Sequence, residues 1–81
     1  MRVIAEISHP QVKISIFYMN QKYIIKFEMH NLEQTYKLSE LDYIIKDLED
    51  VKKAITPDFV NSVLEQFENM LNLQDKFTKD L

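Results

Sequence analysis

The spacing of apolar residues changes once along the chain, near Ser39. Before this residue, apolar and polar side chains alternate with a period of about two, which is typical of half-buried β-strands. After it, apolar residues recur every three to four positions, as they do on one face of a helix. The pattern therefore predicts an α+β domain in which the strands come first and the helices last.

Turn signals divide the first half of the chain into four strands. Pro10 ends the first strand, because proline fixes φ and lacks a backbone N–H group. Asn20-Gln21 is typical of a two-residue hairpin turn, since asparagine tolerates positive φ. A further turn near His30 leaves residues 32–38 as the last strand. We expect a four-stranded antiparallel meander, or three strands if the last one is irregular.

The turn at Asn20-Gln21 decides which side chains share a face of the sheet. It sets Tyr18 opposite Tyr23, and the same pairing continued outward collects apolar residues on one face. The members of this face are Val3, Ala5, Ile7, Val12, Ile14, Ile16, Tyr18, Tyr23, Ile25, Phe27, Met29, Leu32, Gln34, Tyr36 and Leu38. We expect this face to form the core, with Gln34 as its polar member.

Two starts are open for the first helix. Ser39 can cap a helix that has acidic residues in its first turn. Residues 43–45 are equally strand-like, which favours a later start near Asp47. The apolar stripe of the longer helix comprises Leu41, Ile44, Ile45, Leu48, Val51 and Ile55. Thr56-Pro57 then opens the second helix, with threonine as the N-cap and proline at the first helical position.

Both helices carry an apolar stripe, so we expect them to pack together on the apolar face of the sheet. In the second helix this stripe runs from Phe59 to Leu71. We expect the helix to fray after Leu73, because the following residues are mostly polar. The chain is then a single domain over residues 1–75 with a mobile tail over residues 76–81.

The opposite face of the sheet mixes charged residues with apolar ones that the core does not explain. The predicted rows across it are Glu6, Lys13 and Glu28, then Ile4, Ser15, Lys26 and Thr35, then Arg2, Phe17, Ile24 and Lys37, with Met19 and Lys22 at the turn end. The candidate interface consists of the apolar residues Ile4, Phe17, Met19 and Ile24 and their basic neighbours Arg2, Lys22, Lys26 and Lys37.

Three hypotheses explain this outer patch. In the first, another protein covers it, most simply a second copy of the chain. The first and fourth strands, as sheet edges, could also extend the sheet of such a partner. In the second, Phe17 and the basic residues form a stacking platform for single-stranded nucleic acid or act as another regulatory binding surface. In the third, the C-terminal tail covers the patch through Phe77 and Leu81.

The distribution of charge favours a protein partner over nucleic acid. Residues 1–38 hold five basic and three acidic side chains, a net charge of +2. Residues 39–81 hold five basic and ten acidic side chains, a net charge of −5. The isoelectric point of the chain is about 5.3. A sheet with a net charge of only +2 releases few counterions from nucleic acid, so this interaction gains little.

Missing residue types exclude several kinds of site. The chain has no glycine and no cysteine. A phosphate-binding loop or dinucleotide fingerprint needs glycine, and disulfides and thiolate metal sites need cysteine. His9 and His30 lie at one end of the predicted sheet near Glu6, Glu28 and Glu33, and are a candidate divalent-metal site. Exposed turn histidines are the simpler interpretation, because no metal motif is present. We expect no cofactor and no enzymatic activity.

The segments ISHPQVKISIF, KYIIKFE and LEQTYKLSE resemble stretches of short bacterial proteins of unassigned function. The resemblance covers about the first half of the chain and brings no catalytic motif. It implies a small stand-alone bacterial protein of the cytoplasm. No apolar run approaches the roughly 18 residues that a membrane span needs. We therefore expect a non-enzymatic interaction module that forms a homodimer through the open sheet face or an edge strand.

Overall fold

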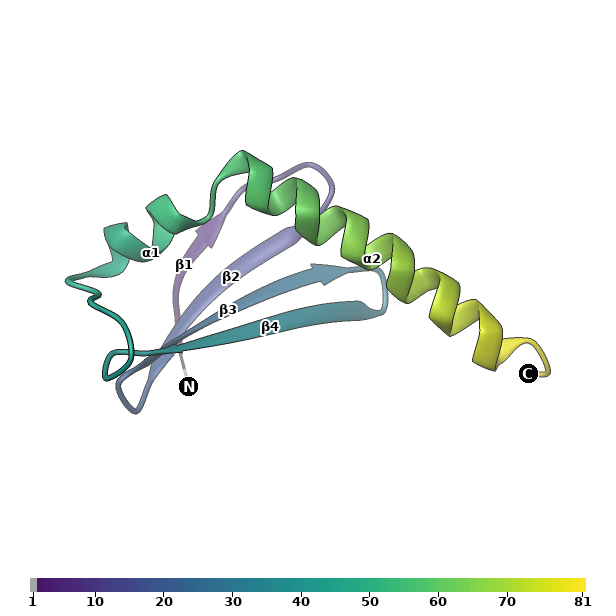
Figure 1. Cartoon of the computed structure of the whole chain (residues 1–81), viewed down its shortest axis with the longest axis horizontal. Coiled ribbons are helices and arrows are strands. Elements are labelled where there is room, and N and C mark those ends of the chain that lie inside the picture. Colours follow the sequence, from purple (N-terminus) through teal and green to yellow (C-terminus); the bar gives the residue numbers. More distant parts are fainter. Residues whose placement is uncertain (1) are drawn as a thin grey trace.

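The computed structural model describes residues 2–81 and has the element order ββββαα. The elements are β1 (Arg2–Ile7), β2 (Lys13–Met19), β3 (Lys22–Met29), β4 (Leu32–Ser39), α1 (Leu48–Ala54) and α2 (Pro57–Thr78). The strands form one antiparallel sheet in the order β1-β2-β3-β4. Both helices lie on the same side of this sheet (Figure 1). The predicted α+β meander is confirmed, and its fourth strand is regular.

Residues other than glycine make the tight turns. Asn20 and Gln21 have φ angles of 52° and 62°, as a type I′ hairpin turn requires. His30 has a φ of 55° in the next turn. Each of these left-handed residues costs about 1 kcal/mol or more. The turn at Asn20-Gln21 gives the predicted register, with Tyr18 opposite Tyr23.

The pairing of β1 with β2 contains a β-bulge that the alternation did not predict. Val3 lies opposite Phe17 and Ala5 lies opposite Ile16, which leaves Ile4 as an extra residue. The bulge shifts the alternation by one position, so Val3 is on the outer face. The prediction that Val3 belongs to the core face is therefore wrong, and its side chain is 45% exposed.

The core lies between the sheet and the two helices. Its buried apolar members are Val12, Ile14, Ile16, Tyr23, Ile25, Phe27, Val51, Val60, Val63 and Phe67. The buried Gln34 side chain is satisfied within this core. Its Nε2 donates to the Val63 carbonyl oxygen at 3.0 Å, and its Oε1 accepts from the Tyr36 hydroxyl at 2.8 Å. The bond to Val63 ties β4 to α2, and the bond from Tyr36 holds the Gln34 side chain in place within β4.

The first helix begins at the later of its two predicted starts. Asp47 is the N-cap of α1, and its side chain accepts a hydrogen bond from the Asp50 backbone N–H. Ser39 is instead the last residue of β4, paired with Lys22. The helix start predicted at Ser39 is therefore wrong, because the β3–β4 ladder continues through this residue.

Helix α2 begins as predicted and ends later than predicted. The Thr56 Oγ1 accepts from the Phe59 backbone N–H at 3.1 Å, and Pro57 is the first helical residue. The helix runs on to Thr78, past Leu73, so fraying at that point is not observed. Mobility of residues 76–81 stays a prediction.

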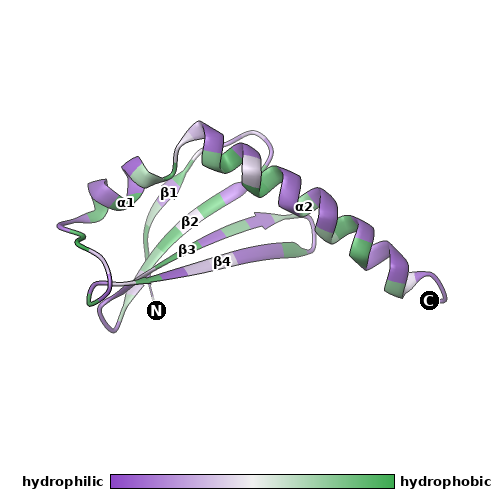
Figure 2. Cartoon of the chain, viewed as in Figure 1, coloured by the Kyte–Doolittle hydropathy of each residue, from purple (hydrophilic) through white to green (hydrophobic). Residues whose placement is uncertain are grey.

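The C-terminal part of α2 projects past the end of the sheet (Figure 1). Apolar bands continue along this projecting part (Figure 2). The molecule measures 47 × 25 × 21 Å and its radius of gyration is 14.4 Å, whereas a compact chain of this length is expected near about 12 Å. The elongated shape leaves part of α2 without a sheet beneath it.

Candidate functional site

The bulge changes the composition of the outer sheet face at its β1 edge. Val3 takes the place beside Phe17 that the alternation gave to Arg2. Arg2 lies opposite Tyr18, a residue of the other face. Ile4 is the extra residue and belongs to no cross-strand pair. Of the predicted interface, Arg2 and Ile4 therefore do not occupy their expected positions in the rows.

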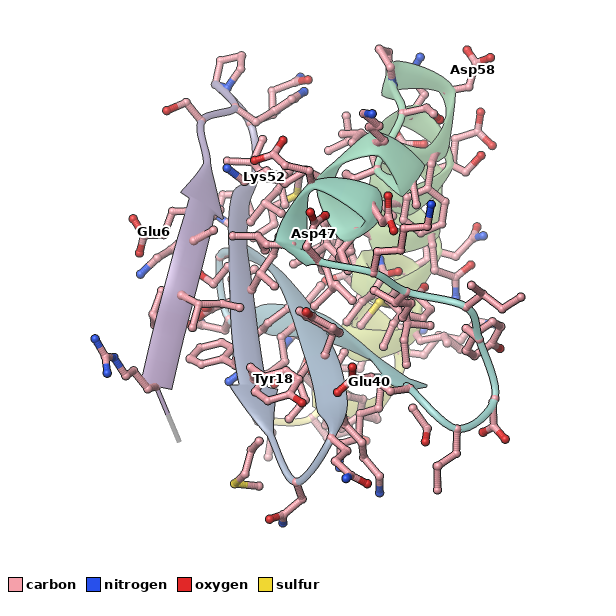
Figure 3. All side chains as sticks on the ribbon, turned by 90° about the vertical axis from the view of Figure 1, so that its left-hand side faces the viewer. Glu6, Tyr18, Glu40, Asp47, Lys52 and Asp58 are labelled. Carbon is pink, nitrogen blue, oxygen red and sulfur yellow. The ribbon has the colours of Figure 1, made fainter. Side chains whose placement is uncertain are left out.

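The charged row predicted at the other end of this face is also separated, because β1 pairs with β2 there two residues away from the predicted register. Glu6 lies opposite Ser15 and not beside Lys13. Lys13 keeps its predicted neighbour Glu28. Figure 3 shows Glu6 pointing away from the helices. The continuous row of Glu6, Lys13 and Glu28 is therefore wrong, although the Lys13–Glu28 pair of opposite charges is confirmed.

Much of the predicted apolar patch is already covered by its own neighbours. Ile24 is only 5% exposed, so it is not available as a contact residue. Phe17 is half-buried, and the Lys26 Nζ lies 5.4 Å from its ring centroid in a cation–π contact. Met19 and Ile4 remain exposed by 41% and 39%. The open apolar area is therefore confined to the hairpin turn and the β1 edge.

Three lysines lie around the part of this patch that remains exposed. Lys22 pairs with Met19 at the turn, and Lys37 pairs with Ile24 on β4. Lys26 lies further along β3, beyond the position opposite Lys37, with its Nζ 3.9 Å from a Glu33 carboxylate oxygen. Face-to-face pairing of two copies would set these lysines against each other, and like charges at an interface are unfavourable.

The C-terminal residues do not cover the outer patch in the structure. Phe77 and Leu81 are 73% and 98% exposed. They lie at the projecting end of α2, and α2 is on the opposite side of the sheet from the patch (Figure 1). The hypothesis of a covering tail is therefore not supported by the arrangement of α2.

The two histidines lie around an open hollow of about 640 Å³ at the end of β1, β2 and β3. His9 and His30 line it together with Glu6 and Glu28. The His9 Nδ1 accepts a hydrogen bond from the Gln11 backbone N–H at 3.1 Å. Within residues 2–81 no three His, Asp or Glu side chains come close enough to hold a metal ion.

The two edges of the sheet differ in regularity. β1 is interrupted by its bulge, which is one way in which proteins block an edge strand. β4 pairs with β3 without interruption, from Met29 opposite Leu32 to Lys22 opposite Ser39. No strand within residues 2–81 lies beyond β4. The β4 edge is therefore the one suited to receive another strand.

The hairpin before β4 determines which backbone groups face this open edge. A two-residue turn is closed by a hydrogen-bonded pair, here Met29 with Leu32. Hydrogen-bonded and non-bonded pairs then alternate along an antiparallel ladder. Leu32 and every second residue after it therefore bond to β3. The backbone N–H and C=O groups of Glu33, Thr35 and Lys37 point outward from the edge.

A groove accompanies the β4 edge on its helical side. One part, of about 440 Å³, lies between β4 and α2 and is lined by Tyr36, Phe59 and Gln66 among others. A second, apolar part of about 270 Å³ continues toward α1. Tyr36 and Phe59 line both parts and pack edge to face, with ring centroids 6.0 Å apart. They are 41% and 38% exposed, so two partly exposed aromatic rings lie beside this edge.

Sequence reasoning also missed an exposed apolar connection between β4 and α1. Leu41 and Ile44 were expected on a buried helical stripe, and they are 85% and 95% exposed. The Tyr43 backbone N–H bonds to the Ser39 carbonyl oxygen at 3.2 Å. This single turn is not continued, so the helical spacing of Leu41 and Ile44 is never realised. The equal strand and helix propensity of residues 43–45 was the signal for this break.

Tyr18 anchors this connection to the hairpin. Its hydroxyl donates a hydrogen bond to the Glu40 carboxylate, and the two side chains lie side by side in Figure 3. The hydrogen bond to this carboxylate is the main reason that the pKa of Tyr18 is raised. Burial is the main cause for Tyr23, whose pKa is also raised, followed by the charges of nearby carboxylates, Glu40 first. Both tyrosines therefore stay protonated and act as structural donors or core groups.

Comparisons of the chain with known protein families, with curated proteins and with solved structures find no match. The resemblance to short bacterial proteins stays a prediction. Among the helices of residues 2–81, none has the length and hydropathy to cross a bilayer. The fold is therefore established from the structure, and the candidate interaction surface is the β4 edge with its aromatic groove.

Proposed function

We propose that this protein is a non-enzymatic interaction module whose partner is a second copy of itself, bound at an edge of the sheet. The observation that carries the proposal is β4, an edge strand of eight residues without a bulge. Such an edge presents a row of backbone donors and acceptors to any added strand. The half-exposed rings of Tyr36 and Phe59 supply apolar surface beside it.

The titratable groups support an interaction role. Tyr18 and Tyr23 have raised pKa values, and the causes are a structural hydrogen bond and burial in the core. Groups tuned for catalysis are usually found together in a cleft that binds a substrate. Two of the polar groups that line the groove beside β4, Gln34 and the Tyr36 hydroxyl, are bonded to each other. They serve the packing of β4 on α2.

The open sheet face is the competing surface for self-association. Two observations weaken it: Ile24 is buried, and the basic residues Lys22, Lys26 and Lys37 gather around the apolar residues at the turn end of the face. A copy of the same face is therefore a poor partner for it. The β4 edge has no comparable penalty, because Glu33 and Lys37 on this strand carry opposite charges.

Sedimentation equilibrium from low to high micromolar concentration tests the proposal. We expect a dimer that Thr35→Pro converts to a folded monomer, because proline removes an outward N–H group and its ring blocks the edge. Thr35→Val is the matched control, which keeps the backbone donor and the dimer. Phe17→Glu on the open face is expected to leave the mass unchanged.

Two outcomes of this experiment contradict the proposal. If the wild-type chain stays monomeric at high micromolar concentration, self-association is not its function. If Phe17→Glu separates the copies while Thr35→Pro does not, the open face is the interface. Circular dichroism of each variant checks that a change in mass does not come from unfolding.

A further inference from the structure

We propose that two copies pair through β4 in antiparallel orientation, about a twofold axis at Thr35. Glu33 of each chain then lies opposite Lys37 of the other. This inference rests on the proposed function and adds to it the register and the residues that select it. The partner is thus defined as a second copy in a closed, symmetric dimer.

The backbone restricts the registers that such a dimer can use. Residues directly opposite each other in an antiparallel pair have side chains on the same face. The outward backbone groups belong to Glu33, Thr35 and Lys37, which share the open face of the sheet. A paired β4 must therefore set members of this series opposite one another. A slip of one residue would turn apolar side chains from the helical face to the open face.

Charge then selects one register from this series. An axis at Glu33 brings two glutamates together, and an axis at Lys37 brings two lysines together, and both arrangements are unfavourable. An axis at Gln34 pairs Glu33 with Thr35, and an axis at Tyr36 pairs Lys37 with Thr35, so neither forms a pair of opposite charges. The axis at Thr35 forms the Glu33–Lys37 pair twice, with an overlap over residues 32–38 that no other register of this series exceeds.

The helical face agrees with the same register. Leu32 of one chain lies opposite Leu38 of the other, and Gln34 lies opposite Tyr36. The twofold axis is perpendicular to the sheet, so the α2 helices of both copies lie on the same face. The grooves beside the two β4 strands then meet, and the half-exposed rings of Tyr36 and Phe59 become covered.

Charge reversal tests the register directly. Glu33→Lys leaves only basic residues at the paired positions, and Lys37→Glu leaves only acidic ones. Two pairs in each dimer change from attraction to repulsion, so we expect each variant alone to raise the dimer Kd by about ten- to a hundred-fold.

The two variants mixed together provide the stricter test. In the mixed dimer, the two introduced charges meet each other across the interface and the two native charges form the second pair, so both pairs again have opposite signs. We therefore expect native-like affinity and a mixed species that exceeds both parent dimers in native mass spectrometry. The double variant Glu33→Lys/Lys37→Glu should also recover its affinity, because the pair is only inverted.

Matched controls separate the register from general charge effects. Glu6→Lys on β1 and Lys13→Glu on β2 make the same changes in charge away from β4, and we expect them to leave the dimer intact. If the wild type is dimeric but the β4 variants pair as tightly as the controls, the register at Thr35 is wrong and the proposed function stands. If the wild type is monomeric, both fail.

Discussion

Replacing Phe67 by alanine should test where the core ends along α2. The Phe67 side chain is fully buried against the sheet, with 0% exposure. Removing a buried phenylalanine costs about 3–5 kcal/mol, through lost transfer free energy and the cavity that remains. Phe77 lies on the same helix and is 73% exposed. Its replacement by alanine should change the free energy of unfolding by less than about 0.5 kcal/mol.

The expected loss is large for a chain of 81 residues. Domains have roughly 0.05–0.15 kcal/mol of stability per residue, which gives about 4–12 kcal/mol here. Phe67→Ala would therefore remove about a quarter of the stability or more. In a domain of this size, each kcal/mol lowers the Tm by about 4–8 °C. The Tm of Phe67→Ala should fall by more than about 12 °C, while that of Phe77→Ala stays within a few degrees of wild type.

Urea titration followed by circular dichroism measures both variants. It should be run at a protein concentration low enough for the chain to be monomeric, so that association adds nothing. Both substitutions give the helix the same gain in propensity, which cancels in the comparison. Equal losses for Phe67→Ala and Phe77→Ala would refute the reasoning, because the end of α2 would then be packed and not projecting.

Two further predictions concern the cap of α1 and the tyrosines. Asp47→Ala should lower the free energy of unfolding by about 1 kcal/mol by removing the N-cap. Ser39→Ala should cost less, because Ser39 does not cap a regular helix; equal losses in urea would place the helix start at Ser39 instead. Tyr18 and Tyr23 have raised pKa values, so their stabilising effect is complete below the unfolded value of about 10 and is lost as pH rises through the folded values. Stability measured from pH 8 to 11 should therefore fall at the alkaline end, less steeply in Tyr18→Phe, and an unchanged slope in that variant would contradict the role of Glu40.

The parts of the fold that follow from sequence are those where period and turn chemistry agree. The turn at Asn20-Gln21 fixes the β2–β3 register, and alternation carries it to β4. The bulge escaped prediction because residues 3–5 are all apolar. Polar and apolar residues do not alternate at these positions, so the sequence pattern does not reveal a shift of one residue. The predicted positions of Arg2, Val3 and Ile4 were wrong for this reason, whereas the row of Glu6 was wrong because β1 pairs with β2 two residues away from the predicted register.

The candidate site was predicted less well than the fold. Burial of Ile24 depends on how its neighbours on β2 and β4 close over it, and a pattern of residue types does not contain that information. The start of α1 depended on whether Ser39 stays in the ladder with Lys22, a competition between two structures of similar local propensity. The sequence could not favour β4 over β1 as the edge that pairs with a partner, because the bulge in β1 was not predicted.

The bulge at Ile4 also bears on how far assembly can proceed. A sheet with two regular edges can add copies on both sides, and such growth continues into fibres. In the proposed dimer, pairing through β4 would use up the regular edge of each copy. Both outer edges of the resulting sheet are then β1 strands interrupted by the bulge. One additional residue in the first strand would thereby block the addition of further copies and limit the assembly to a dimer.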